Sequence, residues 1–253
     1  MSIKVMSFNL RYDNEGDGEN RFTKRLPRVI ELIRSESPDI IGFQEVTDPM
    51  RKMLYGALDG YLFCGCGRDK NYHGEAMLIA YRYDTVELLR CDNIWLSETP
   101  SVPGSHYGNG HSGCPRMYTQ LLLKHNDVEK PFTFINTHLD HEGGRLIEAK
   151  QLCSAMASLD GHFILTGDFN ACPSDPEILY ITESLAHKNA IDCTAELGPT
   201  FHDFGRRTID RQLKIDYIFT SAKCERAYKI DDEAPNGLYY SDHNAVVALI
   251  NLD

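Results

Sequence analysis

Short apolar runs recur along the whole chain and are separated by polar segments that contain glycine. Runs of about four to eight apolar residues are typical of strands buried in a sheet. The strands predicted from this pattern are residues 3–8, 40–43, 61–64, 76–81, 85–91, 93–96, 117–124, 131–136, 162–166, 215–220 and 245–252.

Amphipathic stretches lie between some of these runs. Phe22, Val29 and Ile33 recur at helical spacing, which predicts a helix with Pro27 in its first turn or at its start. Further helices are predicted over residues 146–159, 53–58 and 175–185. Strands outnumber helices, and hairpins mix with helical crossovers. The pattern therefore indicates an α/β protein with one mixed sheet or two sheets, and with helices outside.

Length and composition favour one domain. The chain has 253 residues, of which 42% are hydrophobic, enough for a substantial core. No linker rich in Pro, Gly or Ser and no repeat is seen, so a single domain over residues 1–253 is expected. The sequence has no apolar stretch of about 18 residues, and its start lacks the pattern of a secretory signal. We expect a cytoplasmic protein, with a monomer as the default state.

The charge balance narrows the range of partners. The formal net charge is −11, whereas proteins that grip long nucleic acids usually present a basic face. Tight non-specific DNA binding and attachment to an anionic membrane are therefore not expected. A small or localised phosphoester is favoured as the partner.

The eight cysteines do not suggest a disulfide framework in a chain of this length without a signal peptide. The closest pair, in Cys64-Gly65-Cys66, lacks the two-residue spacing of a zinc knuckle or a redox pair. Reduced thiols are expected throughout.

Polar motifs follow the predicted strands at the points where those strands end. They are Phe8-Asn9, Gln44-Glu45, Asn136-Thr137-His138, Gly167-Asp168-Phe169-Asn170, Ile215-Asp216-Tyr217 and Ser241-Asp242-His243. If the strand ends meet, several carboxylates come together, and such groups repel one another and lose hydration. A hard divalent cation together with a phosphate is the natural partner of such a cluster.

Two of these motifs carry a recognisable chemistry. Asp168 and Asn170 can both face one substrate if the backbone between them is extended, and Gly167 would relieve the turn. In Ser241-Asp242-His243 a carboxylate lies beside an imidazole, which suits a metal ligand next to a general base.

Taken together and in this order, the motifs from Asn9 to His243 resemble the endonuclease/exonuclease/phosphatase superfamily, the deoxyribonuclease-I-like Mg²⁺-dependent phosphoesterases. Residues 94–100 and the form Asn-Thr-His-Leu-Asp-His are similar to its nocturnin and deadenylase-like branch. Abasic-site repair members usually carry a Tyr where His138 stands. The resemblance implies a four-layer α/β/β/α sandwich of two mixed β-sheets flanked by helices, with the site at one edge.

The resemblance also implies a set of metal ligands. Glu45 would be the main Mg²⁺ ligand, helped by Asn9, and Asp242 would reach the same ion or a second one. Mn²⁺ could replace Mg²⁺. Zinc is the alternative metal because histidines are present, although a zinc site needs three closely spaced protein ligands.

The catalytic residues follow from the same resemblance. Asp168 and Asn170 would orient the attacking water and hold the scissile phosphate. His243, paired with Asp216, would act on that water or stabilise the pentacovalent state. His138 would contact a phosphate oxygen or the leaving group, and Glu75 would orient His138.

Other residues are candidates for substrate contacts, each with a plainer alternative. Arg116 would lie near the phosphate or form a surface ion pair. His141 and Arg145 begin a predicted helix, whose N-terminus favours an anion. Arg206 would meet a second phosphate or lie in a solvated loop. Trp95 would stack on a base or sugar or belong to the core.

The function expected from these features is Mg²⁺-dependent hydrolysis of a phosphodiester or phosphomonoester, with a small or single-stranded substrate. The alternatives are an endonuclease for duplex DNA, a sphingomyelinase-type lipid phosphodiesterase and a binding module without activity. Residues 11–20, 66–75, 97–115 and 199–212 are expected to form the rim of the site and to select the substrate.

Overall fold

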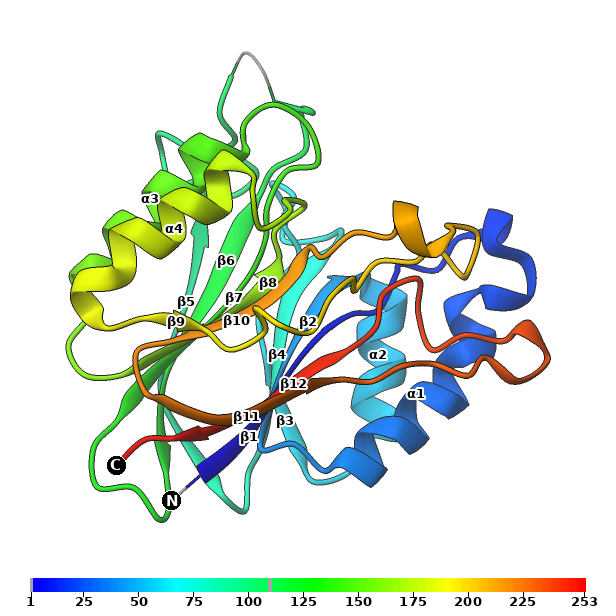
Figure 1. Cartoon of the computed structure of the whole chain (residues 1–253), viewed down its shortest axis with the longest axis horizontal. Coiled ribbons are helices and arrows are strands. Elements are labelled where there is room, and N and C mark those ends of the chain that lie inside the picture. The colour runs from blue at the N-terminus through cyan, green and yellow to red at the C-terminus, as the bar shows by residue number, and fades with distance from the viewer. Residues whose placement is uncertain (1, 109–110) are drawn as a thin grey trace.

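Two six-stranded sheets pack face to face in the computed structural model, which describes residues 2–108 and 111–253 (Figure 1). The first sheet has the order β11 (Lys223–Lys229), β12 (Val246–Asn251), β1 (Ser2–Asn9), β2 (Ile40–Val46), β4 (Ala76–Arg82) and β3 (Tyr61–Cys64). The second has the order β5 (Val86–Trp95), β6 (Met117–His125), β7 (Phe132–His138), β8 (Phe163–Asp168), β10 (Asp216–Thr220) and β9 (Ile191–Asp192). Each sheet combines parallel and antiparallel pairs.

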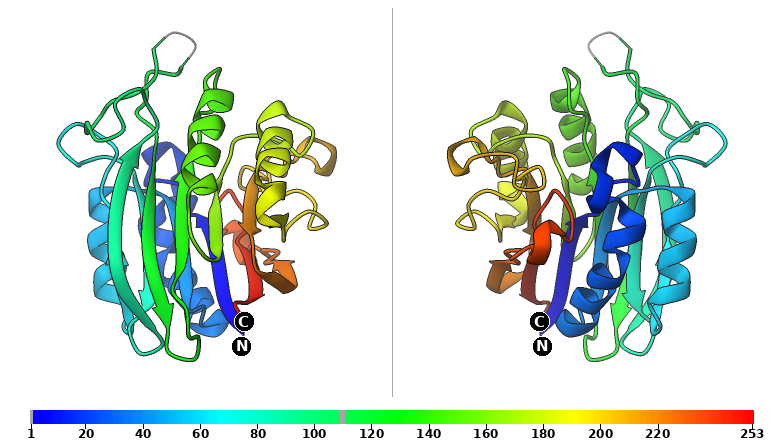
Figure 2. Two further views of the ribbon diagram at one scale, coloured as in Figure 1. Left: turned by 90° about the vertical axis from the view of Figure 1, so that its left-hand side faces the viewer. Right: turned by 90° about the vertical axis from the view of Figure 1, so that its right-hand side faces the viewer.

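Helices cover the outer faces of both sheets. Helices α1 (Phe22–Glu36) and α2 (Asp48–Ala57) share one hydrophobic cluster with the first sheet. Helices α3 (Arg145–Ala157) and α4 (Pro176–Leu185) share another with the second sheet, and Figure 2 shows the two helix pairs on opposite sides. The predicted four-layer sandwich is therefore confirmed.

Strand alternation explains how one strand serves two layers, because successive side chains point to opposite faces of a sheet. In β1, Met6 and Phe8 pack toward the helices, whereas Ile3 and Val5 enter the layer between the sheets. Because both faces of this strand are buried, successive residues are apolar, which gives the continuous apolar run seen in the sequence.

Three strand predictions differ from the structure. Residues 85–91 and 93–96 form one strand, β5, in which a bulge between Leu88 and Arg90 shifts the register. Strand β11 was not predicted, because this edge strand has few buried positions and a polar sequence. The short edge strand β9 was missed for the same reason.

Two helix predictions also need correction. Helix α1 begins at Phe22, so Pro27 lies inside the helix rather than in its first turn. Helix α2 begins at Asp48, ahead of the predicted start at residue 53, with Pro49 in its first turn. Proline is favoured there because the first helical amides have no partner within the helix.

Asn136, the first residue of the Asn-Thr-His motif, links the two sheets. Its amide nitrogen donates to the carbonyl oxygens of Phe43 (2.7 Å) and Leu78 (3.2 Å). Its oxygen accepts from Gln44 Nε2 (2.7 Å) and Thr166 Oγ1 (3.2 Å). A buried network with this many satisfied bonds holds the sheets in one alignment.

All eight cysteines are free. Among the described residues, no helix combines the length and the apolar character required to cross a bilayer.

Arg25 of α1 is fully buried and joins three loops. Its guanidinium donates to the backbone oxygens of Leu10 (2.8 Å), Arg11 (3.0 Å), Asn20 (2.5 Å) and Tyr240. Burial lowers its pKa to about 10, so the side chain is still charged at neutral pH. The loops after β1 and before β12 are thereby fixed to α1.

Replacing Arg25 with Met is expected to lower the free energy of unfolding by about 2–4 kcal/mol, because buried carbonyl oxygens lose their donors. Urea denaturation measures the difference. Arg34→Met is the matched control, since Arg34 lies on the exposed face of the same helix and donates to a single carbonyl oxygen. Equal stability losses in the two variants would contradict the role assigned to Arg25.

Candidate active site

One histidine and two aspartates form a row across three adjacent strands of the second sheet. His138 at the end of β7 pairs in register with Asp168 at the end of β8. Asp168 in turn pairs with Asp216 at the start of β10. Because β10 runs antiparallel to β8, the beginning of one strand meets the end of the other. Motifs far apart in the sequence therefore meet at one edge of the sheet.

A cavity of about 360 Å³ opens over this row. The residues that line it are Arg11, Tyr12, Glu45, Arg68, Glu75, Cys114, Arg116, His138, His141, Asp168, Asn170, Phe201, Ile215, Asp242 and His243. Each of the four segments predicted to form the rim contributes at least one of them. The cavity brings together nine of the predicted site residues, and Asn9 and Asp216 contact residues that line it.

His243 and Asp216 form a buried pair. Nδ1 of His243 lies 2.9 Å from Oδ2 of Asp216, and the same carboxylate oxygen accepts a hydrogen bond from Thr200 Oγ1 (2.5 Å). Burial on its own opposes a charge on His243, but the carboxylates of Asp216, Asp168 and Asp242 outweigh it and raise its pKa to about 10. The imidazole is therefore held as a cation in a fixed orientation.

Asp168 lies between this pair and the rest of the cavity. Its carboxylate accepts hydrogen bonds from Asn9 Nδ2 (3.0 Å) and from the backbone N–H of Asn170 (2.9 Å). Oδ2 lies 3.7 Å from Nε2 of His243 and 3.6 Å from Nε2 of His138. Burial raises the pKa of Asp168 to about 7, so this carboxylate can take up a proton near neutral pH.

Glu45 and Asp242 supply carboxylates to the same cavity. Glu45 accepts hydrogen bonds from Asn9 Nδ2 (3.1 Å) and the backbone N–H of Tyr12 (3.0 Å). Burial, together with the nearby Glu45 charge, raises the pKa of Asp242 to about 6. Asp242 is buried and Glu45 is half-buried. Two such carboxylates that repel each other provide the oxygen ligands that Mg²⁺ prefers, so these residues fit a hard divalent cation.

Asn9 contacts two carboxylates of the site, and its role as a metal ligand stays a prediction. Its amide nitrogen donates to both Glu45 and Asp168, and its amide oxygen accepts the backbone N–H of Arg11 (2.9 Å). This arrangement orients two carboxylates at once. The side chain therefore links Glu45 and Asp168 through its hydrogen bonds.

The backbone is strained where the side chains enter the cavity. Glu45, Asn170 and Arg11 have left-handed φ values of 62°, 48° and 52°. Residues other than glycine adopt this region at a cost of about 1–3 kcal/mol each, and they cluster at functional sites. The backbone is not extended at Asn170, yet Asp168 and Asn170 both line the cavity. The left-handed turn at Asn170 lets its Nδ2 reach Nε2 of His138 (3.0 Å).

Cationic and neutral donors gather around His138. Burial, followed by the charges of Arg116 and Arg68, lowers the pKa of His138 well below its usual range, so the imidazole is neutral. Arg116 is buried, yet its Nε and Nη1 have no hydrogen-bond partner. Its Nη2 lies 3.1 Å from Nδ1 of His141. Buried guanidinium donors without partners are suited to an anionic ligand.

Glu75 lines the cavity, but its partner is Arg68 instead of His138. Arg68 Nη1 and Nη2 each lie 3.0 Å from one carboxylate oxygen of Glu75. Nδ1 of His138 has no hydrogen-bond partner among the described residues. The prediction that Glu75 orients His138 is therefore wrong, because the bidentate contact with Arg68 occupies the carboxylate.

Trp95 is not available for stacking on a ligand in the cavity. It is only 2% exposed, its ring packs with Met77 and Met117, and its Nε1 donates to the backbone oxygen of Arg68 (2.7 Å). Trp95 therefore belongs to the core, which was the alternative interpretation of this residue. Trp95 supports the loop that carries Arg68.

Arg145 and Arg206 also lie outside the residues that line the cavity. Arg145 donates to the backbone oxygen of Asn170 and faces Glu177 at 3.6 Å, so it supports the site from behind. Arg206 is exposed and pairs with Asp203 (3.3 Å). Of the two alternatives for Arg206, the structure fits a residue in a solvated loop.

Several residues at the site were missed in the sequence. Arg11 lies 3.8 Å from Asp242 and 3.1 Å from Asp17, and its position directly after the Asn9 motif was the available signal. Arg68 and Phe201 lie in predicted rim segments. Thr200 carries no local signal, because its role depends on meeting Asp216 from another part of the chain.

Gly167 is required for close packing and not for a turn, contrary to the prediction. Its φ is not positive, but a Cβ at this position would lie closer than 3.0 Å to the backbone oxygen of Thr137 in the neighbouring strand. Only glycine allows β7 and β8 to approach this closely beside Asp168.

Gly167→Ala is expected to lower the free energy of unfolding by about 1–3 kcal/mol, since the added methyl group must displace backbone. Thermal unfolding measures the loss. Gly56→Ala provides the control, because a Cβ at this helical position meets nothing within 4 Å, and alanine favours a helix. A Gly167→Ala protein as stable as the control would contradict the packing argument.

Comparisons with known proteins agree with this geometry. A protein from Bacteroides vulgatus, described as an endonuclease/exonuclease/phosphatase, has 29% sequence identity and a TM-score of 0.91, with 100% of both chains covered. A mannosyl-6-phosphatase from Bacteroides thetaiotaomicron has 28% identity and a TM-score of 0.86, covering 99% of this chain and 100% of that one. The human nocturnin catalytic domain shares the fold, with 19% identity, a TM-score of 0.76 and coverage of 100% and 95%.

The family model described as "Endonuclease/Exonuclease/phosphatase family" matches residues 6–243. This segment includes all the motifs whose side chains meet at the cavity, from Asn9 to His243. Members of this family are phosphoester hydrolases. The chain belongs to the endonuclease/exonuclease/phosphatase family.

Proposed function

We propose that this protein is a Mg²⁺-dependent phosphoesterase that hydrolyses a small phosphorylated molecule. One observation carries the proposal. A single cavity is lined by a pair of carboxylates suited to a cation, by His243, which is paired with the buried Asp216, and by Arg116, whose guanidinium has donors without partners. These elements suit hydrolysis of a phosphoester, because the phosphate repels a nucleophile until its charge is neutralised.

Glu45 and Asp242 are the residues that would hold the cation. When bound, Mg²⁺ would supply a positive charge that polarises the phosphate oxygen. Asn9 keeps the Glu45 carboxylate in place through its amide nitrogen. Arg11 offsets part of the negative charge, since its Nε lies 3.8 Å from Asp242.

Asp168 is proposed to orient the attacking water and to accept its proton. The hydrogen bonds from Asn9 and Asn170 fix the carboxylate, and burial keeps its pKa near neutrality. His243, held by Asp216, would donate a hydrogen bond to the phosphate as charge builds up in the transition state. The cationic state of His243 suits that role better than the role of a base.

Arg116, His138 and Asn170 are proposed to bind the phosphate oxygens. Arg116 offers free donors. Nδ2 of Asn170 already contacts Nε2 of the neutral His138, so the two side chains present a fixed surface to a ligand. Preorganised donors of this kind act mainly on the transition state.

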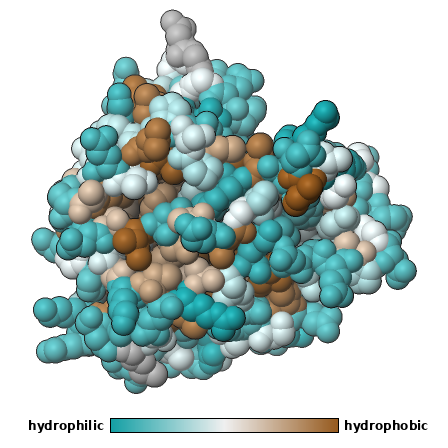
Figure 3. Space-filling view, in the orientation of Figure 1, coloured by the Kyte–Doolittle hydropathy of each residue, from teal (hydrophilic) through white to brown (hydrophobic). Residues whose placement is uncertain are grey.

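The size of the cavity supports a small substrate. A volume of about 360 Å³ lies at the low end of the range for small-molecule sites. The formal charge of −11 disfavours duplex DNA. On the face shown in Figure 3, apolar residues occur in small groups among polar ones, which gives no support to a lipid substrate. The similarity to a mannosyl-6-phosphatase makes sugar phosphates the first compounds to assay.

The proposal is tested with a panel of sugar phosphates, nucleotides, inositol phosphates, oligonucleotides and choline phospholipids, each assayed with Mg²⁺, with Mn²⁺ and with EDTA. We expect phosphate release from a small monoester or diester, lost in EDTA and restored by Mg²⁺. Glu45→Gln should raise the Mg²⁺ concentration needed for activity, because it removes a charged ligand. The exposed Glu31→Gln serves as the matched control.

Activity that survives in EDTA and in Glu45→Gln would reject the metal site. Hydrolysis of duplex DNA or choline lipids in preference to all small compounds would reject the proposed substrate class while leaving the reaction intact. If no compound is hydrolysed although Mg²⁺ binds, the protein would be a binding module instead.

A further inference from the structure

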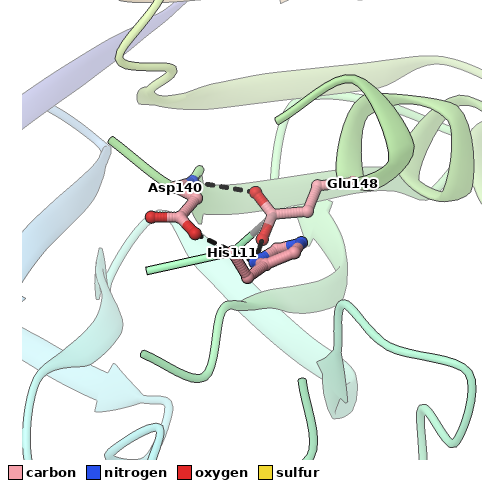
Figure 4. A group of neighbouring side chains, drawn as sticks. All are labelled: His111, Asp140 and Glu148. Carbon is pink, nitrogen blue, oxygen red and sulfur yellow. Dashed lines mark hydrogen bonds and ion pairs between the residues drawn. The ribbon is translucent and has the colours of Figure 1, made fainter. Parts of the chain in front are cut away.

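Figure 4 shows a second group of potential metal ligands, formed by His111, Asp140 and Glu148. His111 comes from the long loop between β5 and β6, Asp140 follows β7, and Glu148 lies in the first turn of α3. Nδ1 of His111 lies 2.9 Å from Oδ2 of Asp140 and 3.5 Å from Oε1 of Glu148. The other oxygen of Glu148 accepts the backbone N–H of Asp140 (2.8 Å), which fixes the two acids relative to each other.

The three side chains are buried but incompletely satisfied. The exposed fractions are 2% for His111 and 0% for both Asp140 and Glu148. Nε2 of His111 and Oε1 of Glu148 have no hydrogen-bond partner, and Nδ1 of His111, although 2.9 Å from Oδ2 of Asp140, makes no well-aligned hydrogen bond. Buried polar atoms in proteins are nearly always paired, so the unpaired Oε1 of Glu148, 3.5 Å from Nδ1 of His111, points to a ligand shared by these side chains.

The spacing of the three ligand atoms fits a compact site. Two ligands at tetrahedral angles, each about 2.0–2.1 Å from a zinc ion, lie roughly 3.3 Å apart. The measured separations of 2.9 and 3.5 Å from Nδ1 lie on either side of this value. All three ligand atoms lie within 4.8 Å of one another.

Gly144, immediately before α3, provides the space for the imidazole. A Cβ on Gly144 would lie closer than 3.0 Å to Nε2 of His111. A side chain at this position would therefore push the ring away from the two carboxylates. The glycine offers a way to perturb the site without removing any ligand.

We propose that His111 Nδ1, Asp140 Oδ2 and Glu148 Oε1 bind a divalent transition-metal ion with the ligand preference of Zn²⁺, at a site separate from the catalytic cavity. One imidazole and two carboxylates form a three-ligand set that suits Zn²⁺. Mg²⁺ is less suitable, because it favours six oxygen ligands and keeps several waters, whereas these side chains are almost fully enclosed.

The ion would position the active site without taking part in the reaction. Asp140 lies 3.6 Å from Nη2 of Arg116 through its Oδ1, and the same oxygen accepts the backbone N–H of His141 (2.7 Å). Fixing Asp140 thus fixes two residues of the proposed phosphate site. The long loop that carries His111 is joined to α3 by the same ion.

The test measures Zn²⁺ binding directly. The full chain is stripped with EDTA and titrated with Zn²⁺ in excess Mg²⁺ by calorimetry, and the retained metal is counted after dialysis. The Glu45→Gln background reduces binding at the catalytic cavity. We expect one equivalent of Zn²⁺ in this background, and loss of that equivalent in His111→Ala and in Gly144→Ala.

Two controls separate a lost site from a lost fold. Circular dichroism of the metal-free variants shows whether each one folds, and Glu148→Gln, which keeps the size of the side chain, replaces any variant that does not. An Asp127→Asn exchange on the exposed β6–β7 turn should leave the stoichiometry unchanged.

Zn²⁺ binding that persists unchanged in His111→Ala, Gly144→Ala and Glu148→Gln would overturn the proposal. Failure of the Glu45→Gln protein to bind Zn²⁺ would overturn it equally, because the three residues would then form only a hydrogen-bonded cluster. Neither outcome affects the phosphoesterase proposal, which is judged by product release in Mg²⁺.

Discussion

An Asp168→Asn exchange is expected to lower kcat for phosphoester hydrolysis by about 10³-fold or more. The carboxylate is the group proposed to align the water and to accept its proton, and loss of a positioned base typically costs about 10²–10⁴-fold. An amide of the same size cannot accept that proton. The measurement is the steady-state rate of phosphate release at saturating Mg²⁺, with the substrate identified by the panel.

The stability of the Asp168→Asn protein should not fall with its activity. Burial raises the pKa of Asp168 to about 7, so the charged form is unfavourable in the folded protein near neutral pH. Thermal unfolding of the Asp168→Asn protein should therefore show no loss of stability. Asp160→Asn, in an exposed turn, is the matched control for activity. An Asp168→Asn protein with normal kcat would remove Asp168 from the mechanism.

Asp216→Asn is expected to reduce kcat by up to about 10⁴-fold, a loss of the size seen when the carboxylate partner of a catalytic histidine becomes an amide. Asp216 is the main carboxylate that keeps His243 charged and oriented. Without it, the pKa of His243 falls and the ring loses its fixed position. The assay is the same as for Asp168.

A double variant shows whether His243 and Asp216 act together or independently in catalysis. If His243 and Asp216 act as a unit, adding His243→Gln to Asp216→Asn should cause little further loss, because effects within a unit are not additive. Thr200→Val removes a neutral donor to Asp216 and should have a much smaller effect. Multiplicative losses in the double variant would contradict the pairing.

The sequence was most informative where a polar residue directly follows a buried strand. Strand order and register then carry Asp168 and His138 to the same edge of the second sheet. Glu45 and Asn9 meet for a similar reason, because β1 and β2 are parallel neighbours and end side by side. For such residues the apolar run before the motif predicts the position, and the side chain predicts the chemistry.

Prediction failed where a role depends on a partner from a distant loop. Glu75 could have reached either His138 or Arg68, and the choice depends on how the loop before β4 folds back. Trp95 was ambiguous because a single aromatic residue suits both a core and a ligand site. Thr200 was missed altogether, since a threonine in a loop says nothing about the carboxylate that it will meet.

Strand β1 spans the distance between the catalytic residues and the ends of the described chain. Ser2, at the start of β1, pairs with Asn251 near the other terminus, while Asn9, at the end of the same strand, contacts Asp168. Eight residues of extended strand cover about 25 Å. A fluorophore, an affinity tag or a surface tether attached beside Ser2 or Asn251 would therefore lie at the end of β1 that is remote from the reaction centre. Immobilised protein should admit substrate as freely as protein in solution.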